Sequence, residues 1–477
     1  MTKTYAERVG ANQAAALVLE ELGIGMHRGV LALYGYPPGD EESPLDLERL
    51  QDVIERALPG VPRVRQRVRR IPLEGRWVWT DDERFNLHYH IRHSRLPRPG
   101  DERQLKRLIG RLMSERLDWN RPLWEAWVIE GVAHARFAVL LKLHAGVLEG
   151  AAIPKLLDAI GELDAASELP PAPAWKPRAA PATAELLVES AAHWSSKSRE
   201  LLGQACEGIR SPRQVRRAGA HARGALAQLA REALGSAPST VLNPRRIGGH
   251  RRIDLLQLCA RECERIGQAL SASIADVALA VLAGALESFL RERGDKLETG
   301  TIHTHISLSP ELGASDEATT CRIPFPLGIG DPVERVVEIG RTRLATATET
   351  RIAMPDLVER LGSWIPPTIQ RAVQSSGVRS GTHLSVDLLA IPARLPALLG
   401  EEARSVALFA PLRIDQGLSV GVACGSRELA FGFNSDWDLF PDLHELVIAT
   451  QRSFEQLHLR TQGAVRASLE IAEEEMA

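Results

Sequence analysis

Long hydrophobic runs, paired cysteines and an excess of charge are all missing from this sequence of 477 residues. No apolar run reaches the roughly 18 to 20 residues needed to span a bilayer, and the N-terminal MTKTYAERVGANQ has no signal-peptide core. Five cysteines, an odd number without a Cys-x-x-Cys pair, are typical of reduced thiols and not of a disulfide framework. A formal net charge of -3 gives no reason to expect nucleic acid as a partner. We therefore expect a globular protein of the cytoplasm.

The chain length and one proline-rich stretch predict two domains. A single hydrophobic core rarely serves as many as 477 residues. Between Glu168 and Thr183 the sequence reads ELPPAPAWKPRAAPAT, whose prolines exclude a helix or a central strand. Residues 184–235 favour crossover helices with a solvated basic face, and contact with an anionic membrane surface is the alternative. The expected division is an N-terminal domain over 1–163, a linker with crossover helices over 164–236, and a C-terminal domain over 237–477.

Hydrophobic periodicity predicts helices and strands in both halves. Helical spacing covers residues 13–22, 45–58, 104–113, 274–286 and 441–459. Strand-like runs cover residues 25–34, 63–70, 126–129, 137–141, 301–308, 418–424 and 429–434. The segment 274–286 is apolar nearly all round, so it should be a buried helix. An α/β protein with a mixed sheet in each half is the expected class.

Two pairs of histidines at alternate positions raise the question of a metal site. His88 and His90, like His303 and His305, would share one face of an extended segment, which is a local geometry that a metal site on a sheet can use. No carboxylate or cysteine stands nearby in a recognisable ligand pattern. Ordinary exposed strand faces also carry such pairs, so we expect no metal and no resident cofactor.

The stretch from Phe137 to Gly150, FAVLLKLHAGVLEG, brings one histidine to the end of a short apolar strand. Ala145 and Gly146 leave room for a ligand to approach the backbone after His144, and residues 151–160 then have helical spacing. Strand-to-helix turns often hold functional side chains, so His144 is a candidate general base. A partly buried histidine that only hydrogen-bonds a carbonyl group is the alternative, and local spacing leaves both open.

Several motifs along the chain resemble those of one enzyme family. Residues 26–29 (MHRG) are similar to PMHxG, 79–93 (WTDDERFNLHYHIRH) to WxxDxxFDLxYHVRH, 96–100 to LPxPG, 117–125 to LDxxRPLWE, and 433–442 to an ending around VPD. Together they resemble the bacterial wax ester synthase/diacylglycerol acyltransferase family nearly end to end. The resemblance implies the two-domain α/β fold of CoA-dependent acyltransferases, similar to chloramphenicol acetyltransferase and to nonribosomal peptide condensation domains, with an active-site tunnel between the domains.

The HHxxxDG signature of that family implies that His144 is the catalytic base. Its second histidine takes the proton of an alcohol, so that the oxygen can attack an acyl-CoA thioester. Leu143 stands at the position of the first histidine, and an ungapped count puts Leu148 at that of the aspartate. One inserted residue would instead bring Glu149 and Gly150 into the last two positions. The expected support for the site loop comes from Gly146, Glu149 and Gly150.

Two further motifs of the family are altered. Its Asn-Asp pair in a buried helix appears as Ala275-Asp276, and its SNxPGP segment keeps only the last proline, Pro392. These three residues are the candidates for the lining of the substrate tunnel.

The function that the resemblance implies is transfer of a long-chain acyl group from acyl-CoA to a hydrophobic alcohol, giving triacylglycerol or a wax ester. Two alternatives stay open because of the altered motifs: a catalytically impaired paralogue that binds lipid or acyl-CoA, and an acyltransferase with another acceptor, such as an amine. The implied partners are acyl-CoA and the alcohol, diacylglycerol or a fatty alcohol. A peripheral position at the inner membrane or at lipid inclusions and a homodimer are further expectations.

Overall fold

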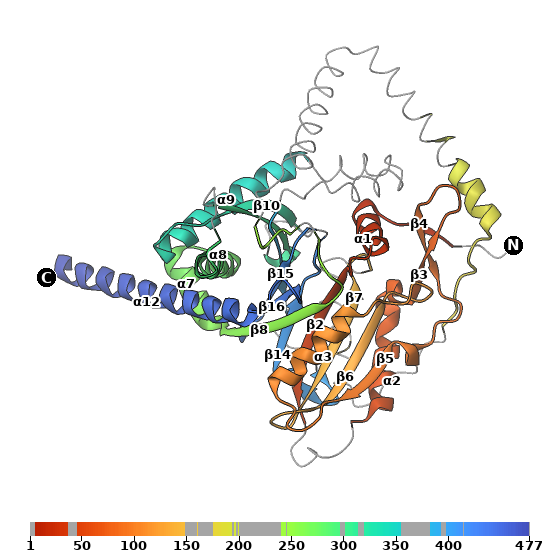
Figure 1. The fold of residues 1–477 in the computed structure, drawn as a ribbon, viewed down its shortest axis with the longest axis horizontal. Coiled ribbons are helices and arrows are strands. Elements are labelled where there is room, and N and C mark those ends of the chain that lie inside the picture. Colours follow the sequence, from red (N-terminus) through yellow and green to blue (C-terminus); the bar gives the residue numbers. More distant parts are fainter. Residues whose placement is uncertain are drawn as a thin grey trace, which may run out of the picture.

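Two large β-sheets, one centred in each half of the chain, form the middle of the molecule (Figure 1). The computed structural model describes residues 5–36, 45–147, 160, 175–192, 195–196, 199, 240–244, 246–295, 301–312, 319–353, 382–392, 397–413 and 415–476. Each sheet has its own cluster of buried apolar side chains. The predicted class, an α/β protein with a mixed sheet in each half, is confirmed.

The N-terminal sheet has the strand order β14-β2-β7-β6-β5. All its neighbours are antiparallel except β5 and β6. Strand β7 lies in the middle and is paired on both edges, which agrees with its apolar sequence and with the complete burial of Phe137 and Leu140. The strands and helices of this part are α1 (Ala11–Glu21), β2 (His27–Gly35), α2 (Leu47–Ala57), β5 (Ile91–Arg95), α3 (Glu102–Ser114), β6 (Trp124–Val132) and β7 (Arg136–His144). A small separate sheet joins β1 (Glu7–Arg8), β4 (Trp77–Asp81) and β3 (Gln66–Arg70).

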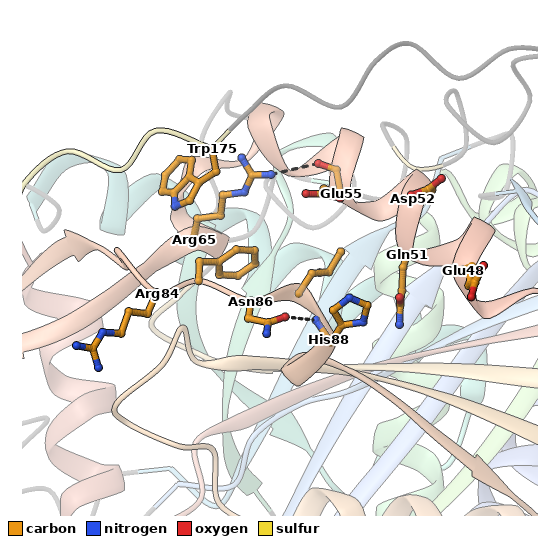
Figure 2. A pocket seen from close by; sticks show the side chains of 11 residues that line it. Glu48, Gln51, Asp52, Glu55, Arg65, Arg84, Asn86, His88 and Trp175 are labelled. Carbon is orange, nitrogen blue, oxygen red and sulfur yellow. Dashed lines mark hydrogen bonds between the residues drawn. The ribbon is translucent and has the colours of Figure 1, made fainter.

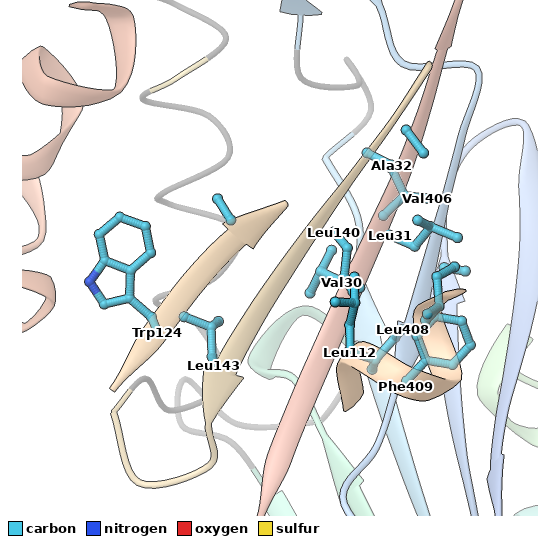
Figure 3. Close-up of a cluster of buried hydrophobic side chains, with 14 of the residues drawn as sticks. Val30, Leu31, Ala32, Leu112, Trp124, Leu140, Leu143, Val406, Leu408 and Phe409 are labelled. Atoms are coloured by element: carbon cyan, nitrogen blue, oxygen red, sulfur yellow. The ribbon is translucent and has the colours of Figure 1, made fainter. Parts of the chain in front are cut away.

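Strand β14 (Ser405–Phe409) comes from the C-terminal half of the sequence but pairs with β2 of the N-terminal sheet. Figure 3 shows Leu408 and Phe409 beside Val30 and Leu31 of β2, in one buried cluster. Strand β14 also contacts two strands of the C-terminal sheet, β15 and β16. The two halves are therefore packed through a shared strand, and the division at 1–163, 164–236 and 237–477 stays a prediction.

The C-terminal sheet has the strand order β10-β9-β11-β15-β16-β8. Helix α8 is almost completely buried, as its sequence predicts, and packs against α7, α9 and α12. In Figure 1 the far end of α12 extends away from the rest of the molecule. The elements are β8 (Arg251–Cys259), α7 (Ala260–Leu270), α8 (Ile274–Glu292), β9 (Thr301–Leu308), β10 (Thr319–Pro326), α9 (Pro332–Ala353), β11 (Leu384–Ala390), β12 (Ala397–Leu398), β13 (Glu401–Glu402), β15 (Leu418–Cys424), β16 (Glu428–Asp436) and α12 (Leu443–Met476).

Three details of the sequence prediction are wrong. His88 and His90 do not share an extended segment, because residues Leu87–Tyr89 form one turn of 3-10 helix. The Asn86 side chain accepts a hydrogen bond from the His88 amide (3.0 Å) and so caps this turn. Such a local hydrogen bond stabilises the turn in place of an extended segment. The strand predicted over 63–70 begins only at Gln66, and the final helix runs to Met476 and not to about Leu459.

Among the described residues no single helix has the length and apolarity of a membrane span, although the pair α7–α8, bent by 100°, passes that test by length and composition.

Candidate active site

His144 is the last residue of β7 and lies directly opposite His27 of β2. The next pair along the two strands, Met26 and Ala145, is joined by a hydrogen bond from the Ala145 amide to the Met26 carbonyl oxygen (2.8 Å). Because bonded and non-bonded pairs alternate in an antiparallel ladder, His27 and His144 form a non-bonded pair, whose Cα atoms are only about 4.5 Å apart. The two imidazole side chains therefore leave one face of the sheet as close neighbours.

The turn after β7 fixes the tautomer of His144. The Gly146 amide donates a hydrogen bond to Nδ1 of His144 (3.0 Å), and the Val147 amide donates to the His144 carbonyl oxygen (2.9 Å). A ring nitrogen that accepts from an N–H group carries a lone pair, so the neutral ring has its proton on Nε2. The lone pair that could take a proton is at Nδ1, facing the turn.

His144 is buried and uncharged near neutral pH. Its side chain is 1 % exposed, and the edge of the Trp119 ring lies against it. Burial lowers the pKa of His144 to about 4; the charge of Glu20 opposes this shift and that of His27 adds to it. A general base must be unprotonated before it acts, so this environment holds His144 in the state that a base needs.

Two side chains beside His144 have no role in the sequence prediction. Glu20, at the end of α1, is buried; its Oε2 accepts from the Met26 amide (2.6 Å), and its Oε1 lies 3.4 Å from Nε2 of His27. Burial raises the pKa of Glu20, but the neighbouring His27 ring and the Met26 amide outweigh burial and leave the pKa at about 2. His27 belongs to the MHRG motif, which is the signal that could have singled it out. No comparable signal marks Glu20.

The C-terminal end of α3 borders the same site. Nδ1 of His27 lies 3.3 Å from the Met113 carbonyl oxygen, and Nζ of Lys142 donates to the carbonyl oxygens of Leu112 (2.8 Å) and Glu115. The last carbonyl groups of a helix lack partners within it and carry partial negative charge, so they stabilise cations. Burial lowers the pKa of Lys142 to about 8 and also lowers that of His27.

The other predicted loop residues fall into three groups. Gly146 lies against His144, because a Cβ atom there would stand 3.2 Å from Nδ1 and 3.3 Å from the Gln13 carbonyl oxygen. Leu148, Glu149 and Gly150 lie outside the described residues. Leu143 is a core residue: it is 1 % exposed and stands opposite Trp124 in the β6–β7 register, as Figure 3 shows.

The predicted tunnel residues stand in the C-terminal half. Asp276 belongs to the N-terminal cap of α8: its Oδ2 accepts from the Ser273 hydroxyl (2.6 Å), and Arg343 of α9 donates to its Oδ1 (2.7 Å). Burial raises the pKa of Asp276, but the hydrogen bonds from Arg343 and Ser273 lower it by a larger amount, so the net shift is downward. Ala275 is buried beside it, and Pro392 is half-buried two residues after β11. The contacts of Asp276 are structural, and a place in a tunnel stays a prediction for all three residues.

A cavity of about 690 Å³ lies in another part of the N-terminal half, between α2 and residues 84–88 (Figure 2). None of the predicted site residues lines it. Arg65 is buried at this cavity beneath the Trp175 ring, and Figure 2 shows its hydrogen bond to the Glu55 carbonyl oxygen (3.2 Å). The lining residues are Glu48, Gln51, Asp52, Glu55, Arg65, Arg84, Phe85, Asn86, Leu87, His88 and Trp175.

One histidine of each pair has a polar partner within the protein. Nδ1 of His90 lies 2.8 Å from the Trp124 carbonyl oxygen, and Nε2 of His305 lies 3.1 Å from an Arg413 nitrogen. Within the parts of the chain that the structure describes, no three His, Cys, Asp or Glu side chains gather in a group that could hold a metal ion.

Solved structures of the same fold cover nearly the whole chain. The wax ester synthase/diacylglycerol acyltransferase from Marinobacter aquaeolei VT8 has a TM-score of 0.66 and 19 % identity, with 96 % of this chain and 100 % of that chain covered. The first condensation domain of the calcium-dependent antibiotic synthetase has a TM-score of 0.57 and 15 % identity, with 95 % and 96 % covered. These likenesses confirm the predicted fold, that of the CoA-dependent acyltransferases.

Sequence relatives identify the family. The sequence matches the wax ester synthase/diacylglycerol acyltransferase catalytic domain over residues 10–278 and the WS/DGAT C-terminal domain over residues 317–458. A relative named as the probable diacylglycerol O-acyltransferase tgs1 of Mycobacterium tuberculosis H37Rv is 26 % identical over 433 residues, 88 % of either chain. Another from that strain, named as the probable diacylglycerol O-acyltransferase tgs3, is 34 % identical over 188 residues, 39 % of this chain and 68 % of the relative. The chain belongs to the wax ester synthase/diacylglycerol acyltransferase family.

Proposed function

We propose that this chain transfers an acyl group from acyl-CoA to the hydroxyl group of a hydrophobic alcohol, with His144 as the general base. The observation that carries the proposal is a buried, uncharged histidine at the strand end where the family motif has its catalytic histidine. The alcohol proton passes to His144 while the oxygen forms a bond to the thioester carbonyl carbon. The carbon–sulfur bond then breaks and the proton passes to the sulfur, which leaves an ester and free CoA thiol.

The Gly146 hydrogen bond determines which ring nitrogen takes the proton. Because the Gly146 amide donates to Nδ1, the lone pair of the neutral ring faces the turn of residues 144–147. The acceptor hydroxyl reaches that lone pair by displacing the amide. Left unpaired in this buried turn, the displaced amide would cost about 1–3 kcal/mol, so the step needs the oxygen of the same hydroxyl group as a new acceptor for the Gly146 amide. Glycine at position 146 leaves this approach free of a side chain.

The finer assignments rest on the family resemblance. The acceptor is diacylglycerol or a fatty alcohol, the donor is a long-chain acyl-CoA, and the products are triacylglycerol or wax ester. The tunnel between the two halves is lined in part by Ala275, Asp276 and Pro392, and Glu149 and Gly150 support the loop after His144. A peripheral position at a membrane or lipid inclusion and a homodimer belong to the same proposal.

A thiol-release assay on the purified chain tests the reaction. Long-chain acyl-CoA is supplied with diacylglycerol, with a fatty alcohol, or without acceptor, and the lipid products are separated. We expect CoA thiol to appear together with an equal amount of ester, and only when an alcohol is present. Thiol release that does not depend on the acceptor would contradict acyl transfer.

The second candidate is a non-catalytic family member that binds lipid or acyl-CoA. The observation in its favour is the 1 % exposure of His144, whose Nδ1 is already occupied by the Gly146 amide. Calorimetry distinguishes the two candidates, because this second function predicts that acyl-CoA binds without turnover on any acceptor.

A further inference from the structure

Three buried side-chain atoms around His144 have no hydrogen-bond partner: Glu20 Oε1, His27 Nε2 and His144 Nε2. They come from α1, β2 and β7 respectively, and each belongs to a side chain that is at most 2 % exposed. Buried polar atoms without a partner are rare, because each loses its hydration, so a group of three calls for an explanation. The His27–His144 strand pairing and the 3.4 Å separation of Glu20 Oε1 from His27 Nε2 bring the three side chains together.

The surroundings of His27 favour a proton between it and Glu20. A carbonyl oxygen can only accept, so Nδ1 of His27 carries the proton in its contact with Met113. A neutral His27 would then present a lone pair to the Glu20 carboxylate, which is repulsive. A proton shared between Nε2 and Oε1 removes this repulsion and makes the ring positive. The charge of Glu20 and the C-terminal end of α3 favour that positive ring, whereas burial, which lowers the pKa of His27, opposes it. Glu20 and His27 therefore act as one buried unit.

We propose that Glu20, supported by His27, is the carboxylate whose charge stabilises the positive ring of His144 during acyl transfer. The inference rests on the proposed function, because it assigns a role in proton removal by His144. The neutral His144 carries its proton on Nε2, the atom without a partner, and its lone pair on Nδ1. Glu20 does not hydrogen-bond His144, since neither Glu20 Oε1 nor His144 Nε2 has a partner, so the carboxylate acts on the ring through its charge while the substrate hydroxyl meets Nδ1.

This arrangement supplies an anion from α1. The ungapped position of the motif aspartate is Leu148, which has no charge. Glu20 is close enough that its charge raises the pKa of His144, although burial dominates the total. The other charged groups facing this cluster are Lys142 of β7, which donates to the end of α3, and Arg251 of β8, which donates to the Gly248 carbonyl oxygen (2.8 Å). Glu20 and His27 are positioning residues, since the Nδ1 side of His144 is where substrate arrives.

Three single substitutions in the full chain test the role. Glu20→Gln removes the charge but keeps an oxygen for the Met26 amide. His27→Gln removes the positive partner and keeps Glu20. Glu21→Gln is the matched control, because Glu21 is the next residue of α1, is exposed, and lies 3.5 Å from Arg70. Thermal unfolding of each variant shows that it is folded.

The first readout is the titration of His144 by NMR in protein labelled with ¹⁵N-histidine, with the His144 signals assigned by their loss in His144→Gln. We expect the wild-type ring to be protonated on Nε2. The pKa should fall in Glu20→Gln and rise by about one unit in His27→Gln, since one nearby charge is removed in each. Shifts in the same direction, or no shift in either variant, would overturn the inference. This readout needs no turnover, so it separates the inference from a failure of the proposed function.

The second readout is the rate of ester formation. A nearby anion raises the pKa of a positive ring by about one to three units. If Glu20 has this effect on His144, kcat should be about tenfold to a thousandfold lower in Glu20→Gln, with KM nearly unchanged. Glu21→Gln should match the wild type. An active wild type with equal kcat values in Glu20→Gln and Glu21→Gln would overturn the role of Glu20 while leaving that of His144 intact.

Discussion

Arg28 of β2 donates a hydrogen bond to Oδ2 of Asp387 on β11 over 2.7 Å, and this ion pair joins the N-terminal sheet to the C-terminal sheet. The side chains are 16 % and 13 % exposed, so water screens their attraction only weakly. Asp387 also offsets the charge of Arg413, whose pKa is lowered by burial. Together with strand β14, this ion pair links the N-terminal and C-terminal halves of the chain.

Asp387→Asn should lower the free energy of unfolding by about 1–3 kcal/mol, because it leaves Arg28 partly buried without its anion and leaves only Asp415 to offset the charge of Arg413. Urea unfolding measures the change. Glu402→Gln is the control, since Glu402 pairs with Arg427 where the side chains are 38 % and 63 % exposed, and such pairs contribute little. Equal losses in the two variants would mean that the Arg28–Asp387 pair has no special part in joining the halves.

Gly432→Ala should destabilise the protein by about 1–3 kcal/mol. A Cβ at Gly432 would collide with the Leu408 carbonyl oxygen, so β14 would have to move away from β16. Gly463→Ala is the control: it lies in α12, where a Cβ would meet nothing within 4 Å, and alanine should stabilise the helix slightly. Thermal unfolding of both variants measures the difference. A Gly432→Ala protein as stable as the wild type would contradict the close approach of β14.

Glu428 should make stability depend on pH in an unusual direction. Burial raises the pKa of Glu428 to about 7, while the Val406 amide of β14 donates to its Oε1 (2.9 Å). The unfolded chain has an ordinary pKa of about 4.3, so the folded state binds the proton more tightly. This contribution to stability is complete below about pH 4.3 and is lost as the pH rises to about 7.

Glu428→Gln tests that dependence because it cannot ionise and keeps an oxygen for the Val406 amide. At pH 8 the variant should exceed the wild type in unfolding free energy by about 1–2 kcal/mol, a figure reduced for the partial exposure of the carboxyl group. Near pH 4 the two should agree. Urea unfolding from pH 4 to 8 measures both curves, and curves that run parallel would exclude a raised pKa.

Gly146→Ala should reduce kcat about tenfold, because the new methyl group stands 3.2 Å from Nδ1 of His144 and the ring must shift. Gly60→Ala provides the comparison, since a Cβ there meets nothing within 4 Å. Steady-state rates of ester formation measure both variants. Full activity in Gly146→Ala would argue against substrate approach from the Nδ1 side.

Local pattern was enough to predict most of the fold. The apolar run of β7 and the all-round apolar sequence of α8 predicted two buried elements, and both predictions are confirmed. Strand β14 could not be predicted in place, because Ser405 pairs with Leu33 at the other end of the chain and no short-range pattern encodes that pairing. The turn at Leu87–Tyr89 depends on one side-chain cap from Asn86, which hydrophobic periodicity does not register.

The sequence singled out candidate site residues only where a motif marked them. His144 was located by its strand and by the family signature, whereas Glu20 and Glu21 are alike in sequence at the end of one helix. Only the tertiary structure makes Glu20 buried, where it contacts the Met26 amide and His27, and leaves Glu21 exposed. The tautomer of His144 was also out of reach, since it depends on where the Gly146 amide points.

The most direct test of the catalytic assignment is the rate of ester formation by His144→Ala under saturating long-chain acyl-CoA and alcohol. Loss of a general base predicts a rate about a hundredfold to ten-thousandfold below the wild type, with the binding of acyl-CoA preserved. A variant that forms ester at the wild-type rate would contradict the role of His144.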